Sequence, residues 1–260
     1  MKIYSVINMD IVNSRNSENR AELQEQLKHY FKHLNLEYNN ILVAPITFTL
    51  GDEWQIVLRC CSETYNIFSK IKKFLRKHNA AAYCGIGIGT ISTKESEDTR
   101  QMDGKAFIYA REALNTLKAN SKISKEHIKT KDCKTLLIGE TIDMTDFYKE
   151  SEELNEELDH SEVAATSSIE IDIVDLINTV IQNNELLESR LTDKQVEVID
   201  LYEKYGSYKS IERRMPEYSK SNISHKLSSA NYFLNVNNKK TICNLLEVYS
   251  TLLKGRLYEN

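Results

Sequence analysis

Residues 47–55, TFTLGDEWQ, predict a tight β-hairpin around which the rest of the chain can be arranged. Gly51 stands at the tip between two apolar runs, at residues 41–48 and 54–58. Glycine adopts turn conformations that other residues resist, so the turn can be short. The hairpin therefore places Asp52 where a strand ends and solvent begins.

A second predicted strand, at the amino terminus, also ends at an aspartate. The sequence MKIYSVINMDIVNSR, residues 1–15, is apolar up to Asp10 and then becomes polar. Because Mg²⁺ and Mn²⁺ take carboxylate oxygens, Asp10 and Asp52 are candidate ligands of one divalent ion. Asn13, Ser14 and Arg15 precede a predicted helix and could bind the phosphates of a nucleotide.

These hairpin and strand-end residues also have an ordinary explanation. Aspartate at a strand end and Gly-Asp-Glu in a turn are common turn chemistry. Glu53 either adds a third carboxylate to a metal site or points away from it. Trp54 could stack on a nucleobase, but a lone tryptophan at a strand start is more often part of the core.

The first 140 residues alternate between strand and helix patterns. A helix capped by Ser17 precedes the hairpin, and a helix opened by Ser62 follows it. A strand within residues 80–92, a helix at 105–120 and a strand within 133–139 complete the series. The basic residues of the second helix are assigned to its solvated face: Lys70, Lys72, Lys73, Arg76 and Lys77. The order β-α-β-β-α-β-α-β predicts an α/β sandwich with helices on one face of a mostly antiparallel sheet.

Three alternating glycines mark the predicted strand at residues 80–92. Gly85, Gly87 and Gly89 share one face, because side chains alternate along a strand. Their lack of side chains makes room either for a closely packed helix, which is the commoner case, or for a ligand.

The composition fits a soluble chain long enough for two domains, or for one domain with a substantial appendage. Its 260 residues carry a formal net charge of -4. No apolar run approaches the roughly 20 residues that span a bilayer, and the amino terminus lacks a secretory pattern. We therefore expect a cytoplasmic protein with no membrane partner. The five cysteines include no C-x-x-C pair and are expected to be reduced and buried.

The middle of the chain is strongly acidic. Residues 140–175 contain many aspartates and glutamates but a single lysine or arginine, Lys149. Such a segment repels itself and buries little surface. Residues 141–168 are therefore expected to link an α/β domain at 1–140 to a helical domain at 169–260.

Residues 191–232 show the pattern of a helix-turn-helix. Thr192 and Ser219 are expected caps, and Gly206 is an expected helix stop. Residues 204–240 are basic within an acidic protein, which favours a phosphate backbone as partner. The third helix would direct its early polar residues to base edges of double-stranded DNA: Ser219, Lys220, Ser221, Asn222, Ser224, His225 and Lys226. A basic three-helix unit can also be a protein-interaction module.

The last predicted helix, residues 239–255, KKTICNLLEVYSTLLKG, is apolar on one face. It either completes the core of the small domain or pairs with its copy in a homodimer. A homodimer would suit a palindromic DNA site.

Four motifs together resemble the SatD family of bacterial proteins: MDIVNSR, TLGDEWQ, GIGIGTIS and DGKAFIYAREAL. In order and spacing, the first three also resemble class III nucleotidyl cyclases and, more loosely, diguanylate cyclases. The three-helix unit resembles the helix-turn-helix of sigma-factor region 4. These resemblances imply a ferredoxin-like α/β domain with a small all-α domain after it.

The cyclase resemblance also implies roles for individual residues. It implies a metal site formed by Asp10, Asp52 and the carbonyl oxygen of Ile11. Gly51 and Glu53, in the hairpin, are further candidate nucleotide contacts. Arg111 matches the arginine that stabilises the transition state in cyclases, although it could equally be a surface charge. The asparagine of that cyclase motif is replaced by Phe107, so binding is expected more than catalysis.

Three hypotheses of function follow from the sequence. The first is a nucleotide- and metal-binding regulator that binds DNA through its helix-turn-helix. The second is an active metal-dependent nucleotidyl cyclase or nucleotidyltransferase that makes a cyclic or oligomeric nucleotide. The third is a scaffold that binds other proteins through its acidic segment and its carboxyl-terminal helices.

Overall fold

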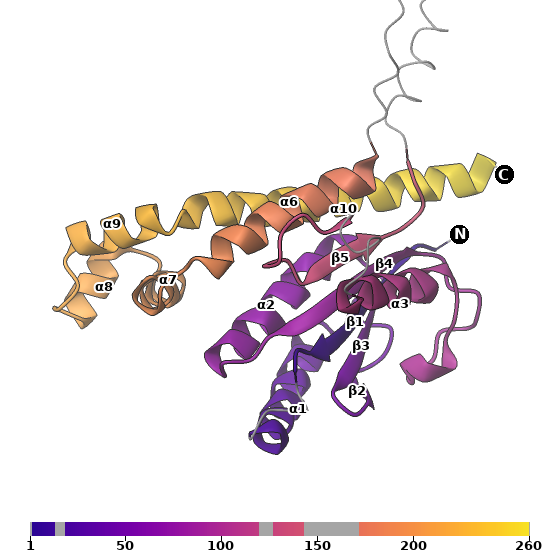
Figure 1. Ribbon diagram of the computed structural model, residues 1–260, viewed down its shortest axis with the longest axis horizontal. Coiled ribbons are helices and arrows are strands. Elements are labelled where there is room, and N and C mark those ends of the chain that lie inside the picture. Colours follow the sequence, from indigo (N-terminus) through magenta and orange to yellow (C-terminus); the bar gives the residue numbers. More distant parts are fainter. Residues whose placement is uncertain (1, 14–18, 120–126, 143–171, 260) are drawn as a thin grey trace, which may run out of the picture.

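A computed structural model describes residues 2–13, 19–119, 127–142 and 172–259 of the chain (Figure 1). Ser14, Arg15 and the expected cap Ser17 lie outside these residues. The expected acidic linker also lies outside them, apart from Thr141 and Ile142.

Five strands form one sheet in the order β2-β3-β1-β4-β5. The strands are β1 (Tyr4–Ile11), β2 (Thr47–Leu50), β3 (Glu53–Leu58), β4 (Ala82–Gly89) and β5 (Thr135–Ile138). Neighbouring strands pair in antiparallel fashion, except that β4 and β5 are parallel. The predicted mostly antiparallel sheet is therefore confirmed, and β1 lies at its centre.

The first strand of the hairpin is shorter than the sequence predicted. The apolar run begins at residue 41, but β2 begins at Thr47. Pro45 lies between them, and proline has no backbone N–H to donate to a ladder. Before Pro45 the pairing reduces to single contacts, such as the hydrogen bond from the Val43 N–H to the carbonyl oxygen of Val57.

Helices cover both faces of the sheet, so the prediction of helices on one face was wrong. The helices that the structure describes between these strands are α1 (Arg20–Glu37), α2 (Thr64–Lys77) and α3 (Lys105–Lys118). α1 and α2 share a core with side chains such as Met9, Ile56 and Ile86. α3 packs on the opposite face, over the glycines of β4. The alternation in β4 explains the difference, because it offers bulky side chains to one face and none to the other.

The glycines of β4 let α3 approach the sheet closely. A Cβ atom on Gly87 would lie 2.1 Å from the carbonyl oxygen of Ala106 and 2.3 Å from the backbone nitrogen of Ala110. A Cβ atom on Gly85 would lie 2.4 Å from the carbonyl oxygen of Ala110. These distances are far inside van der Waals contact. Close packing of a helix is therefore the role of this glycine stripe.

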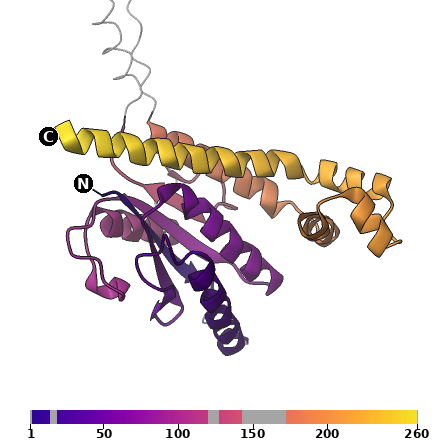
Figure 2. The same ribbon diagram turned by 180° about the vertical axis from the view of Figure 1, so that it is seen from behind.

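The carboxyl-terminal helices run across the α/β layers and form a small cluster at one end (Figures 1 and 2). They are α6 (Ile173–Ser189), α7 (Asp193–Tyr205), α8 (Tyr208–Arg214), α9 (Lys220–Ser229) and α10 (Tyr232–Glu259). Ile177 and Ile181 of α6 and Leu246 of α10 belong to the same core as β1 and α2. α7, α8 and α9 enclose a small core of their own: Val198, Ile211, Tyr218, Ile223 and Leu227.

The apolar face of α10 lies on the α/β core, in neither of the two positions that the sequence suggested. Leu246 and Tyr249 are fully buried, and the Tyr249 hydroxyl donates a hydrogen bond of 2.7 Å to the carbonyl oxygen of Glu140. The core thus covers the face that a homodimer was expected to use.

The assignment of the α2 basic residues to solvent was wrong for Lys72 and Arg76, which contact α6. Lys73 and Lys77 are partly exposed, but they form ion pairs with Asp200 of α7. Local periodicity could not show this, because the carboxylates come from helices far along the chain. The charged side of α2 is therefore the surface on which the helical region rests.

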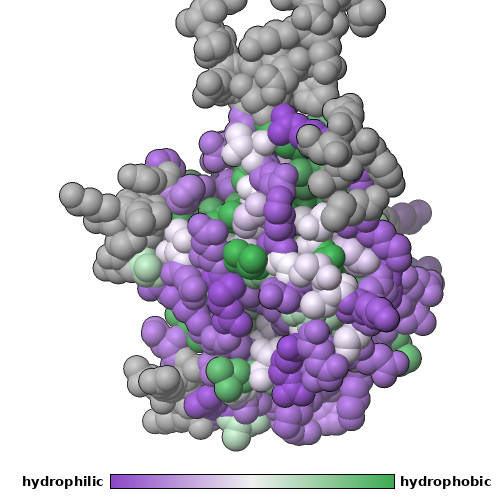
Figure 3. All heavy atoms as spheres, turned by 90° about the vertical axis from the view of Figure 1, so that its right-hand side faces the viewer, coloured by the Kyte–Doolittle hydropathy of each residue, from purple (hydrophilic) through white to green (hydrophobic). Residues whose placement is uncertain are grey.

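The surface at the end of the molecule away from α7–α9 is largely hydrophilic. On the described residues of this face, apolar side chains occur in small separate groups (Figure 3). Within the described parts of the chain, no helix is both long and apolar enough to cross a bilayer.

Candidate functional site

The end of β1 and the β2–β3 turn bring three predicted site residues together. Asp10 lies opposite Glu53 in the register of β1 and β3. Asp52 lies in the turn, where Gly51 has a φ of +62° that favours glycine. We refer to Asp10, Asp52 and Glu53 as the carboxylate edge. Their side chains are between 16% and 21% exposed.

Two cations of α3 bind the carboxylate edge. The Lys118 Nζ atom lies 2.5 Å from Oδ2 of Asp10 and 3.1 Å from Oε1 of Glu53. The Arg111 Nη1 atom lies 3.1 Å from Oε2 of Glu53. Asp10 and Glu53 therefore converge on a single cationic atom, with Arg111 beside them.

Asp52 has a separate cationic partner on α1. The Arg20 Nη2 atom lies 3.0 Å from Oδ1 of Asp52. The carboxylate that shares a cation with Asp10 is thus Glu53, whereas Asp52 was expected to share one. Ile11 ends β1 as a buried residue, and Asn13 follows with a φ of +54°, which asparagine tolerates well.

The pKa values of Asp10 and Glu53 are shifted in opposite directions. Burial raises the pKa of Asp10, and the charges of Asp52 and Glu53 raise it further, while Lys118 opposes the rise. Burial also acts to raise the pKa of Glu53, but the hydrogen bonds from Lys118 and Arg111 outweigh it, so this pKa is lowered. Such opposed effects occur both at ligand sites and in structural ion pairs.

One oxygen of Asp10 and one of Glu53 are placed so that a single cation can contact both. The Lys118 ammonium lies where Asp10 and Glu53 converge, so a divalent ion at this point would take its place. Within the described residues, no group of three or more His, Cys, Asp or Glu side chains is arranged to hold a metal ion. A metal site here would therefore be completed by water or by phosphate oxygens of a ligand.

A cavity of about 640 Å³ lies on the α3 side of the sheet, next to the carboxylate edge. Its lining includes Asn8, Gln55, Phe107 and Arg111, and we call it the α3 cavity. Gln55 Nε2 donates a hydrogen bond of 2.7 Å to Oδ1 of Asn8. Asn8 is 3% exposed, and its Nδ2 group has no partner among the described residues. A buried, unpaired donor costs about 1–3 kcal/mol, so a ligand that accepts from it would be favoured.

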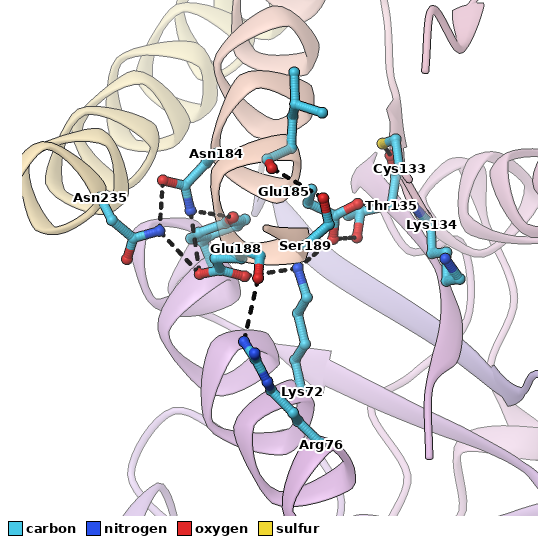
Figure 4. Close-up of polar contacts among 12 residues, drawn as sticks. Lys72, Arg76, Cys133, Lys134, Thr135, Asn184, Glu185, Glu188, Ser189 and Asn235 are labelled. Carbon is cyan, nitrogen blue, oxygen red and sulfur yellow. Dashed lines mark hydrogen bonds and ion pairs between the residues drawn. The ribbon is translucent and has the colours of Figure 1, made fainter. Parts of the chain in front are cut away.

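A second polar cluster joins α2 to α6 and α10 (Figure 4). We call it the junction cluster, and its members are Lys72, Arg76, Asn184, Glu185, Glu188 and Asn235. Lys72 Nζ lies 2.8 Å from Oε1 of Glu185 and 2.7 Å from Oε2 of Glu188. Glu185 is nearly inaccessible and also accepts hydrogen bonds from the Lys134 N–H and the Thr135 hydroxyl. One buried carboxylate therefore ties α2, α6 and the start of β5 together.

Arg76 and Asn235 complete the junction cluster (Figure 4). The Arg76 guanidinium donates to the carbonyl oxygens of Glu188 and Leu191, at 3.2 and 2.9 Å. It thereby satisfies carbonyl groups at the carboxyl end of α6, which a cation also favours electrostatically. Asn235 of α10 donates to Oδ1 of Asn184 at 2.9 Å and to Oε1 of Glu188 at 3.1 Å.

Acid is expected to weaken the junction cluster. Burial acts to raise the pKa of Glu188, but Lys72 and Lys239 outweigh it and lower the pKa from 4.5 to about 2. The folded-state pKa lies below the ordinary value, so the carboxylate stabilises the fold above about pH 4.5, and this stabilisation is lost as the pH falls toward 2. The free energy of unfolding, measured by urea titration, should fall less steeply over this range in Glu188→Gln than in the wild type. Glu22→Gln, on the exposed side of α1, should follow the wild type.

The first part of α9 forms an exposed polar surface. The Ser219 hydroxyl accepts a hydrogen bond from the Asn222 N–H and caps the helix. Ile223 and Leu227 are buried on the opposite side of the helix. The exposed residues on the other side are Ser219, Lys220, Ser221, Asn222, Ser224 and His225. We refer to this set, with the half-buried Lys226, as the α9 surface.

Two acidic residues of α7 are paired with lysines of α2. Asp200 lies 2.6 Å from Lys73 Nζ and 2.8 Å from Lys77 Nζ, and Glu203 also pairs with Lys73. These contacts neutralise Asp200 and Glu203, two of the acidic residues of α7, against α2.

Several of these residues were missed by the sequence analysis. Lys118 lies two helical turns beyond Arg111, so the seven-residue spacing could have placed both on one face of α3. Glu185 continues the stripe of Ile177 and Ile181, and a carboxylate on an apolar stripe predicts a buried partner. Asn8 gave a weaker signal as a polar residue within an apolar strand.

Fold and site together define a mixed α/β protein with a five-stranded sheet and a helical carboxyl-terminal region. The sequence profile of the SatD family matches residues 4–157, more than half of the chain. The chain belongs to the SatD family, as its motifs predicted. A comparison with curated proteins found no match.

Proposed function

We propose that this SatD-family protein is a DNA-binding regulator whose α/β core binds a nucleotide together with a divalent ion. The observation that carries the proposal is the α9 surface, an exposed row of polar and basic side chains on a three-helix unit with its own small core. A capped helix that buries one face and exposes such residues on the other suits the major groove of DNA.

Charge distribution supports DNA as the partner. Asp200 and Glu203 of α7 are paired with Lys73 and Lys77 of α2, which limits their repulsion of a phosphate backbone. Lys220 has its ammonium 3.5 Å from Glu212, in an exposed pair that is easily exchanged for a phosphate contact. Lys226 lies over the ring of Tyr218, 5.2 Å from its centre, which fixes a cation at the edge of the unit.

Alanine at Lys220 is expected to weaken binding of duplex DNA and to lower the slope of log affinity against log salt by about one. The measurement is fluorescence anisotropy of a labelled duplex at several salt concentrations. Lys32→Ala removes the same charge from an exposed position on α1 and should leave both quantities unchanged. Absence of salt-dependent binding in the wild type, or equal effects of the two substitutions, would favour the scaffold hypothesis.

The carboxylate edge is the proposed nucleotide site. Asp10 and Glu53 would hold Mg²⁺ or Mn²⁺, which would neutralise the phosphates, and Asp52 would add negative charge nearby. Released from the carboxylates by the ion, the Lys118 ammonium and the Arg111 guanidinium would be free to contact phosphate oxygens. The convergence of two carboxylates on one cationic atom supports this reading.

A ligand at the α/β core could influence DNA binding through the helices that the core carries. α6 and α10 pack on the core, and α7–α9 lie between these two helices in the chain. The junction cluster fixes the end of α6 that leads into α7. In this proposal the helices have two arrangements that differ in their affinity for DNA. A nucleotide would shift the balance between them by the difference in its own affinity for the two arrangements.

The alternative is an active nucleotidyltransferase, which the position of Arg111 beside the Asp10–Glu53 pair favours. It predicts consumption of a nucleoside triphosphate in the presence of Mg²⁺ or Mn²⁺, and loss of the product in Asp10→Asn. Binding of a triphosphate without its consumption would support the regulator.

A further inference from the structure

We infer that the α3 cavity binds the base of the nucleotide, an inference that rests on the proposed nucleotide-binding function. The cavity has a volume of about 640 Å³, within the range of small-molecule sites. None of the nucleotide contacts predicted from the strand-end and hairpin motifs lies in its lining, so it assigns the base to new residues.

The hydrogen-bonding groups of Asn8 and Gln55 suit the edge of a nucleobase. Both residues line the cavity, and they lie opposite each other on β1 and β3. The bond between them uses Gln55 Nε2 and Asn8 Oδ1, which leaves the unpaired Nδ2 donor of Asn8 and the carbonyl oxygen of Gln55. A donor beside an acceptor matches a base edge, where a ring acceptor or carbonyl lies beside an N–H group.

The same cavity reaches the carboxylate edge. Asn8 and Asp10 project from the same face of β1, because they are two residues apart in a strand. Arg111 lines the cavity and also contacts Glu53. A nucleotide with its base at Asn8 would therefore have its phosphates directed along α3 toward the proposed ion.

The cavity also offers an apolar wall for a flat ring. Phe107 and Met102 line it from the α3 side, where 8% and 6% of their surface remains exposed. A base that lies against them would cover apolar surface while its edge meets the two amides.

The test compares ligands with and without a base. The probes are the four ribonucleoside 5′-monophosphates and inorganic pyrophosphate, each with Mg²⁺, measured by isothermal titration calorimetry on the full chain. The wild type should bind at least one monophosphate. Asn8→Leu, which keeps the side-chain size, should weaken binding of that monophosphate by about tenfold and leave binding of pyrophosphate unchanged. Asn39→Leu, an exposed position after α1, should leave both unchanged.

The possible failures are distinguishable. If the wild type binds pyrophosphate and all monophosphates, and Asn8→Leu changes none of them, the base site is wrong while the nucleotide site stands. If the wild type binds none of the probes, both proposals fail. If Asn8→Leu does not fold, as judged by its melting temperature, Gln55→Leu at the half-buried partner takes its place with the same expected outcome.

Discussion

Gly87→Ala is expected to destabilise the protein by at least about 3 kcal/mol, because overpacking against backbone atoms cannot be relieved by a change of side-chain rotamer. The new Cβ atom would lie 2.1 Å from the carbonyl oxygen of Ala106 and 2.3 Å from the nitrogen of Ala110. The whole of α3 would have to move away from the sheet. Urea unfolding, followed by circular dichroism, measures the loss.

Gly255→Ala is the matched control for this substitution. Gly255 lies within α10, and a Cβ atom there would meet nothing within 4 Å. Because alanine favours a helix over glycine, this change should stabilise the protein by up to about 1 kcal/mol. Equal stability of Gly87→Ala and the wild type would show that α3 does not pack on β4 as described, and the α3 cavity would then lose one of its walls.

Lys72→Met should be the other strongly destabilising change, with a loss of about 3 kcal/mol. Removing one partner of a buried ion pair leaves the other charge without compensation. Here Glu185, 2% exposed, would keep its charge with no ammonium beside it. The Lys72 side chain is itself 33% exposed, which places the expected loss at the lower end of the range for buried pairs.

Two further variants separate the charge effect from a general effect of the substitution. Lys70→Met, on the same helix, breaks an exposed pair with Glu37 and should cost less than about 1 kcal/mol. The double variant Lys72→Met/Glu185→Leu should recover part of the lost stability, because the uncompensated charge of Glu185 is then removed while Glu188 keeps Lys239 as a partner. Similar losses at positions 70 and 72 would mean that the junction cluster does not hold α6 on α2.

Local signals were sufficient to predict most elements of the fold. The hairpin at Gly51 and the caps at Thr192 and Ser219 depend on residues close together in the chain, and all three are confirmed. The glycine stripe on β4 favoured the close helix packing that is observed, although a ligand was left as the other reading. The error at β2 was local as well, since Pro45 within the apolar run could have been taken as a strand breaker.

Contacts between distant segments could not be predicted in the same way. Nothing near Lys72 indicates a carboxylate from α6, and nothing in the pattern of α10 distinguishes the α/β core from a second chain. The candidate site shows the same division. Sequence placed Asp10 and Asp52 at one edge of the sheet, but the lysine that bridges Asp10 to Glu53 comes from the far end of α3.

The most direct test of the regulator is the affinity for duplex DNA with and without nucleotide. Fluorescence anisotropy of a labelled duplex would be measured with each ribonucleoside mono- and triphosphate in the presence of Mg²⁺. We predict that at least one nucleotide changes the dissociation constant by about fivefold or more, and that Asp10→Asn abolishes the change while DNA binding remains. The same DNA affinity with every nucleotide, or no DNA binding at all, would contradict the account.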